Sequence, residues 1–79
     1  MVTRSHHEVA TIIESFVEGT GLDWDWDDFC SHQIDNRELD AIRVRCSELP
    51  FSHPPIVKGH FCNEEGIQFL RRLVEELRR

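Results

Sequence analysis

The hydrophobic positions of the chain fall into three stripes with the spacing of an α-helix. The first stripe recurs at intervals of three and four residues: Val9, Ile12, Ile13, Phe16 and Val17. Ser5 and Glu8 precede most of it with the spacing of a capping box, in which each side chain accepts a hydrogen bond from the other's amide. Gly19 follows, and glycine readily adopts the left-handed conformation that ends many helices. We therefore expect a helix over residues 6–18.

A second stripe predicts another helix: Leu39, Ile42, Cys46 and Leu49. Asp35 stands before it in the position of a capping residue. Pro50 is expected to end this helix, because proline restricts the residue before it and has no amide proton. Arg43 and Arg45 are expected to point outward into solvent.

The third stripe is the clearest: Ile67, Leu70, Leu73, Val74 and Leu77. Asn63 is a suitable N-cap, and Glu64 and Glu65 suit the positive end of the helix dipole. Gly66 in the second turn costs about 1 kcal/mol in helix propensity. We expect another backbone, from residues 50–62, to approach closely there.

Residues 22–29 alternate apolar and acidic side chains, which also fits a strand. We favour a short helix over residues 26–31, with Asp25 as its N-cap. Asp27 and Asp28 then occupy the first turn, where the helix dipole favours acids.

Trp24 before this short helix and Phe29 within it have the spacing of a hydrophobic staple. Residues 50–62 contain three prolines and a glycine, and we expect an irregular loop that packs back on the core through its apolar side chains. The bulk of the core is expected to come from five aromatic residues: Phe16, Trp24, Trp26, Phe29 and Phe51. Together these elements predict an all-α single domain over residues 1–79. It is a small bundle of three amphipathic helices plus one short helix, with an ordered Pro-rich loop.

The net charge of −6 argues against direct binding of nucleic acid, which needs a basic surface. Residues 1–40 carry ten acids and two bases, whereas residues 41–79 carry five acids and seven bases. Such an asymmetry favours a basic protein partner at the acidic half, or head-to-tail self-association into a homo-oligomer. Three cysteines form no paired framework, and no apolar run is long enough for a membrane. We expect a cytoplasmic protein with reduced thiols.

The order of motifs along the chain resembles small uncharacterised bacterial proteins. The resemblance is carried by a first helix, the segment Trp-Asp-Trp-Asp-Asp-Phe at 24–29, a second helix, and Cys-Asn-Glu-Glu-Gly at 62–66 before a last helix. That group has no assigned function. The resemblance implies a bacterial single-domain protein and transfers no site residue.

The acidic segment around the tryptophans is the candidate contact surface for a protein partner. Its residues are Asp23, Trp24, Asp25, Asp27 and Asp28. A basic partner would be held by the carboxylates and anchored by an exposed Trp24. The same acids, together with Asp35, are compatible with an inhibitor that mimics nucleic acid. They are also compatible with helix capping and solubility alone.

A structural zinc site is the alternative reading. Cys30-x-His32 and His60-x-Cys62 supply two thiols and two imidazoles, the ligands of a tetrahedral zinc ion, and His53 is a further candidate. The one-residue gaps are tighter than usual zinc motifs, and small buried cysteines explain the same residues. A calcium loop starting at Asp23 fails, because Asp28 and Ile34 stand where glycine and glutamate are required.

Catalysis has little support in the sequence. Cys62 with His53 or His60 would make a nucleophile pair, and only the proximity of a helix N-terminus would activate the thiol. There is no nucleophile elbow, phosphate loop or HExxH motif. We expect a small acidic interaction protein that is not an enzyme and has no cofactor, with zinc as the alternative.

Overall fold

The computed structural model describes residues 1–19, 23–56 and 61–79, with the side chains of residues 23–25 outside that description. Four helices follow one another along the chain: α1 (His6–Glu18), α2 (Asp23–Ser31), α3 (Arg37–Ser52) and α4 (Glu64–Leu77). The described part of the chain has no strand, only an isolated bridge between Val2 and Ile34. The predicted all-α class is therefore confirmed.

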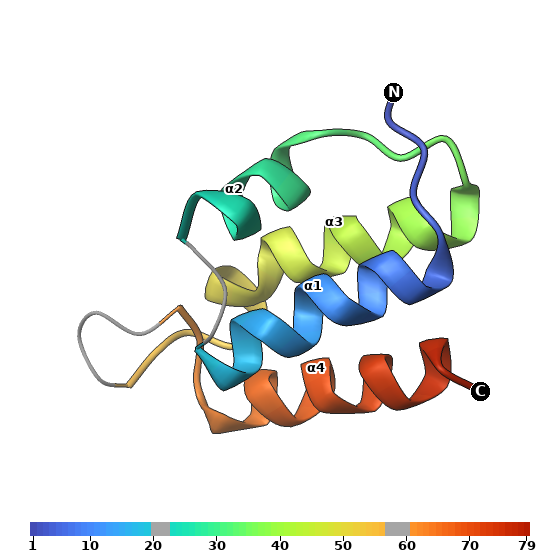
Figure 1. Cartoon of the computed structure of the whole chain (residues 1–79). Coiled ribbons are helices and arrows are strands. Elements are labelled where there is room, and N and C mark those ends of the chain that lie inside the picture. Colours follow the sequence, from blue (N-terminus) through green and yellow to red (C-terminus); the bar gives the residue numbers. More distant parts are fainter. Residues whose placement is uncertain (20–22, 57–60) are drawn as a thin grey trace.

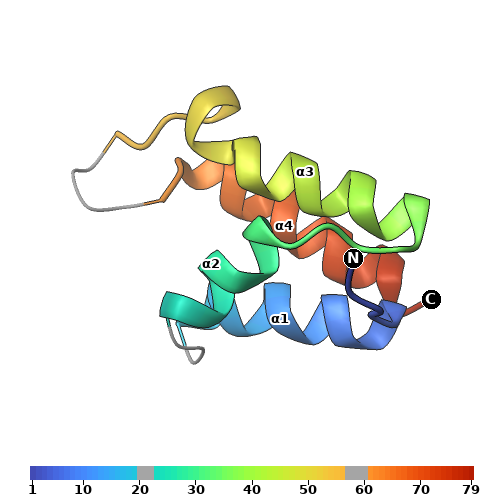
Figure 2. The same cartoon turned by 90° about the horizontal axis from the view of Figure 1, so that it is seen from above.

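The three long helices form a bundle, in which α1 and α3 run in the same direction and α4 runs back (Figure 1). The short helix α2 lies across α1 and α3, on the side away from α4, as the two perpendicular views agree (Figure 2). Both chain termini lie at one end of the bundle. Among the described helices, none combines the length and the apolar character that a membrane span requires.

Three helix ends form as the sequence predicts. At the start of α1, the Glu8 amide donates to Ser5 Oγ at 3.1 Å and the Ser5 amide donates to Glu8 Oε1 at 3.2 Å, which completes the capping box. Gly19 ends α1 with φ at 73°. At the start of α4, the side chain of Asn63 accepts from the Gly66 amide at 3.0 Å.

The ends of α3 differ from the prediction. Asn36 rather than Asp35 is the N-cap, and its side chain accepts from the Leu39 amide at 3.1 Å. Pro50 does not end the helix, which continues to Ser52. Pro50 lies close to the end of α3, so its missing amide proton removes only one hydrogen bond. Leu49, the residue that a following proline disfavours in helical conformation, is held in the helix by its buried side chain.

Helix α2 begins at Asp23, three residues earlier than predicted. Asp25 therefore lies inside the helix and is not its N-cap. Acids interact favourably with the helix dipole in the first turn of any helix. Because this segment has several acids, its composition did not determine the residue at which α2 begins. The hydrophobic staple predicted between Trp24 and Phe29 involves the side chain of Trp24, which lies outside the described part of the chain.

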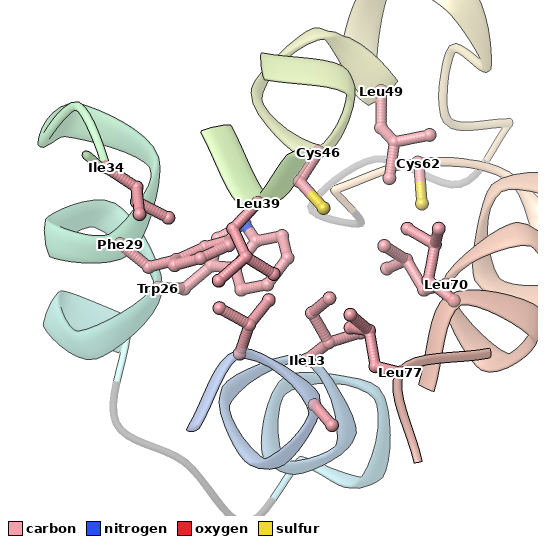
Figure 3. Close-up of a cluster of buried hydrophobic side chains, with 13 residues drawn as sticks. Ile13, Trp26, Phe29, Ile34, Leu39, Cys46, Leu49, Cys62, Leu70 and Leu77 are labelled. Carbon is pink, nitrogen blue, oxygen red and sulfur yellow. The ribbon is translucent and has the colours of Figure 1, made fainter. Parts of the chain in front are cut away.

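The core lies between the four helices (Figure 3). Each helix and the connection after α2 contribute apolar side chains, of which the largest fully buried ones are Phe29, Ile13, Ile34, Leu39, Leu49, Leu70 and Val9. Trp26 and Phe29 are buried as predicted, and Phe16 packs half-buried against them. The expected burial of Phe51 is wrong, because its side chain is 85% exposed.

The loop after α3 also departs from the expectation that it packs on the core. Ile56 is 90% exposed, whereas Phe61 at the other end of the loop is half-buried against the aromatic core. Val57 lies outside the described residues. A side chain can pack only where the loop reaches the bundle, and this loop does so at Phe61.

An N-terminal strap that the sequence did not indicate ties the start of the chain to the connection between α2 and α3. The Val2 amide donates to the Gln33 carbonyl at 2.8 Å, and the Asp35 amide donates to the Val2 carbonyl at 3.0 Å. Thr3 Oγ1 donates to Asp35 Oδ2 at 2.8 Å. These bonds fix the entry of α3 relative to α1.

Candidate functional site

The acidic helix α2 is anchored by an aromatic cluster. The rings of Trp26 and Phe16 stack in parallel, with centroids 3.9 Å apart and planes 10° from each other. Phe61 meets both rings edge-on, at 5.2 Å from Phe16 and 5.7 Å from Trp26. Phe29 adds a fourth ring at 5.5 Å from Trp26. Because large side chains in parallel and edge-on contact bury much apolar area, one face of α2 is held firmly against the bundle.

Two of the five predicted contact residues can be placed in detail. Asp27 and Asp28 are both exposed on α2. The side chain of Asp28 is 50% exposed and lies 3.5 Å from Arg4 Nη2 and 3.3 Å from His32 Nδ1. The remaining three, Asp23, Trp24 and Asp25, have side chains outside the described part.

Several other acids of the first half of the chain are in contact with other residues of the same chain. Glu38 Oε1 lies 3.7 Å from His6 Nε2, and Asp35 binds the Thr3 hydroxyl at 2.8 Å. These contacts account for part of the negative charge without any partner. Asp27 is exposed and has no hydrogen bond or ion pair with another described residue.

Arg43 is the residue whose role the sequence did not reveal. Its side chain is only 15% exposed, so the predicted outward orientation is wrong. Nη1 donates to the Cys30 carbonyl at 2.7 Å, near the C-terminal end of α2, and Nε donates to Asp40 Oδ1 at 2.8 Å. A cation at that end interacts favourably with the helix dipole. The spacing of three residues between Asp40 and Arg43 was the only signal in the sequence.

Asp40 links α3 to the connection after α2 through its carboxylate. The hydrogen bond from Arg43, together with a 2.9 Å hydrogen bond from the Ile34 amide, lowers the pKa of Asp40 below its ordinary value of 3.8. Arg43 is the larger cause. In its charged form, Asp40 therefore holds the start of α3 to Ile34 in the connection after α2.

Of the four candidate zinc ligands, Cys30, His32 and Cys62 lie among the described residues. Burial, with a smaller contribution from nearby Asp27, raises the pKa of the Cys30 thiol to about 11. The His32 ring is exposed, with Nδ1 2.9 Å from the Asp28 carbonyl oxygen. Cys62 is buried, and His60 lies outside the described residues. Among the residues that the structure describes, no three His, Cys, Asp or Glu side chains gather as metal ligands.

Cys62 and His53 are the candidate nucleophile pair, and the surroundings of Cys62 favour its neutral thiol. Burial, and to a lesser extent Glu64, raises the pKa of Cys62. The His53 ring binds Ser52 Oγ at 2.9 Å and stacks on Phe69, with centroids 6.4 Å apart. A raised thiol pKa lowers the thiolate fraction, and the thiolate is the nucleophile.

A groove lies at the end of the bundle opposite the chain termini. It has a volume of about 550 Å³ and is lined by Phe16, Ile56, Phe61, Cys62, Asn63, Glu64 and Ile67. Six of these seven residues are uncharged, so the groove suits an apolar side chain. The sequence did not indicate it, because its lining comes from α1, α4 and the loop before α4.

Comparisons with known proteins found no matching family model, no matching curated protein and no matching solved structure.

Proposed function

We propose that the protein is a small acidic, non-enzymatic binding protein, and that α2 is the surface that receives a basic segment of a protein partner. The observation that carries the proposal is the composition of α2 together with its anchoring. Four of its nine residues are aspartates and none is basic. Trp26 and Phe29 fix the opposite face of the helix in the core.

Rigid placement matters because a preorganised charged surface pays less conformational entropy on binding than a mobile one. The proposal further needs negative charge that is not fully neutralised within the chain. Arg4 is the only arginine or lysine in the first 36 residues, and its contact with Asp28 is 3.5 Å long. The three free cysteines support the further proposal of a cytoplasmic location, where thiols stay reduced.

The test compares two double variants that remove the same charge from different helices. Asp27→Asn with Asp28→Asn neutralises α2, and Glu75→Gln with Glu76→Gln neutralises exposed acids of α4. Binding of a fluorescein-labelled arginine-rich peptide is followed by fluorescence anisotropy at low salt. We expect the α2 variant to bind about fivefold more weakly, as the loss of two exposed ion pairs implies.

The α4 variant should change the affinity less than twofold, or about 0.4 kcal/mol. Equal losses in both variants would mean that the peptide responds to net charge alone, and the proposal would be abandoned. Circular dichroism of both variants checks that the fold is retained. A pull-down with the unmodified protein then identifies the natural partner.

A further inference from the structure

The single arginine of the first 36 residues lies against the acidic helix α2. Arg4 Nη2 donates a hydrogen bond to Asp28 Oδ2 at 3.5 Å. The side chain of Arg4 is only 19% exposed, whereas that of Asp28 is 50% exposed. A carboxylate that is proposed to receive a partner's cation is therefore already in contact with a cation of its own chain.

The backbone of Arg4 is fixed on both sides. On one side, Val2 forms two backbone hydrogen bonds with the connection between α2 and α3, at 2.8 Å and 3.0 Å. On the other side, Ser5 is the N-cap of α1. Figure 1 and Figure 2 both show the N-terminal segment passing beside the connection between α2 and α3. The side chain of Arg4 can therefore leave Asp28 by rotation alone, without movement of the backbone.

The contact between Arg4 and Asp28 is a weak one. Its length of 3.5 Å exceeds the ordinary range for such a hydrogen bond, whereas Arg78 Nη1 donates to Glu14 Oε2 at 2.7 Å. Arg4 Nε is buried and has no hydrogen-bond partner among the described residues. A buried N–H group without a partner is costly, and rotation of the side chain into solvent would restore hydration to this atom. Arg4 therefore covers Asp28 in a way that a better-placed cation can replace.

We propose that Arg4 is an internal competitor of the basic partner segment for Asp28. In the free protein its guanidinium covers this carboxylate, and the partner binds α2 fully only when Arg4 has rotated away. The inference rests on the proposed function of α2 and adds a regulatory contact to it. An arginine of the partner can bind a carboxylate through two parallel hydrogen bonds, so it replaces one long contact by two shorter ones. Displacement of Arg4 nevertheless lowers the net affinity.

The experiment uses the full chain and the fluorescein-labelled arginine-rich peptide, whose binding is followed by anisotropy at low salt. Arg4→Gln removes the charge of the competitor. Since exposed ion pairs change an affinity by up to about fivefold, we expect Arg4→Gln to bind the peptide about threefold more tightly than the unmodified chain. Arg37→Gln, at an exposed position at the start of α3, removes the same charge and is the matched control. It should change the affinity by less than about 1.5-fold, the effect of net charge alone.

A second background separates competition at Asp28 from a general effect of charge. In Asp28→Asn the competitor has no carboxylate to cover, so adding Arg4→Gln should change the affinity by less than about 1.5-fold. An equal gain in both backgrounds, an equal gain from Arg37→Gln, or no gain from Arg4→Gln would each overturn the inference. Circular dichroism checks the fold of every variant. If Arg4→Gln loses helix content, Arg4→Met takes its place, because methionine keeps an apolar stem against the bundle and should give the same gain.

Hydrogen exchange at the Nε–H group of Arg4, followed by NMR of the nitrogen-15-labelled chain, reports the rotation directly. A saturating amount of the peptide should raise the exchange rate at least about fivefold, because the buried atom enters solvent. An unchanged or slower rate would mean that Arg4 stays in place, and the inference would be wrong.

The double variants of α2 and α4 described above test the proposed function separately. If the α2 variant loses affinity and Arg4→Gln gains none, the internal competitor alone is refuted. If the α2 and α4 variants lose affinity equally, the proposed function fails and the internal competitor fails with it.

Discussion

Replacing Gly66 by alanine sets two physical effects of opposite sign against each other. Helix propensity alone predicts that alanine at the third residue of α4 stabilises the fold by about 1 kcal/mol. However, Gly66 is buried, and a Cβ there would lie 2.8 Å from Cys62 Sγ, 3.0 Å from Cys62 Cβ and 3.2 Å from His53 Cβ. Carbon atoms normally approach no closer than about 3.5 Å, so at least one neighbour must move.

The neighbour that must move most has little room. The Cys62 side chain is short and buried between the start of α4 and the core, so the contact cannot be relieved by a long flexible chain end. Overpacking a core by one methyl group costs about 1 to 3 kcal/mol. After subtraction of the gain in propensity, we expect Gly66→Ala to lower the free energy of unfolding by about 1 kcal/mol.

Urea unfolding followed by far-ultraviolet circular dichroism measures this change directly. Cys62→Ala removes the sulfur atom, so Gly66→Ala should be close to neutral in that background, with a coupling of about 1 kcal/mol between the two sites. Gln68→Ala, at an exposed position of the same helix, controls for general effects and should stay within about 0.5 kcal/mol. A stabilising Gly66→Ala, or an identical change in both backgrounds, would refute the steric reasoning.

Two further predictions concern α3. Asn36→Ala should lower the free energy of unfolding by about 1 kcal/mol and Asp35→Ala by clearly less, because Asn36 is the N-cap. Urea unfolding of the two variants compares them, and a larger loss for Asp35→Ala would contradict the observed cap. Because Arg43 and the Ile34 amide lower the pKa of Asp40, its charged form stabilises the fold above pH 3.8, and this contribution is lost as the pH falls through the lowered value. Unfolding free energies measured from pH 6 down to pH 3 should therefore fall less steeply in Asp40→Asn, and an unchanged slope would refute this assignment.

Most of the features that local sequence decides were predicted well, although the N-cap of α3 and the first residue of α2 were not. The capping box of Ser5 and Glu8, the left-handed Gly19 and the Asn63 cap each depend on residues within one turn of one another. Hydrophobic periodicity likewise gave the three long helices, because a side chain's place on a helix follows from its spacing. Even the tight packing at Gly66 was expected from the cost of glycine in a helix, although side chains rather than another backbone make the contact.

Most of the features that were missed depend on contacts between distant residues. Pro50 stays helical because Leu49 is buried against other elements, and Arg43 turns inward because α2 presents the Cys30 carbonyl. The strap through Val2 needs a partner more than 30 residues away.

The features of the candidate site likewise fall into those that the sequence determined and those that required the tertiary structure. The sequence by itself determined where the negative charge is concentrated, since that follows from composition. Only the tertiary structure decided that Asp28 is shared with Arg4 and His32, and that Phe51 projects into solvent. The physical reason is that exposure and ion pairing depend on which surfaces meet, and periodicity along one helix carries no information about its neighbours.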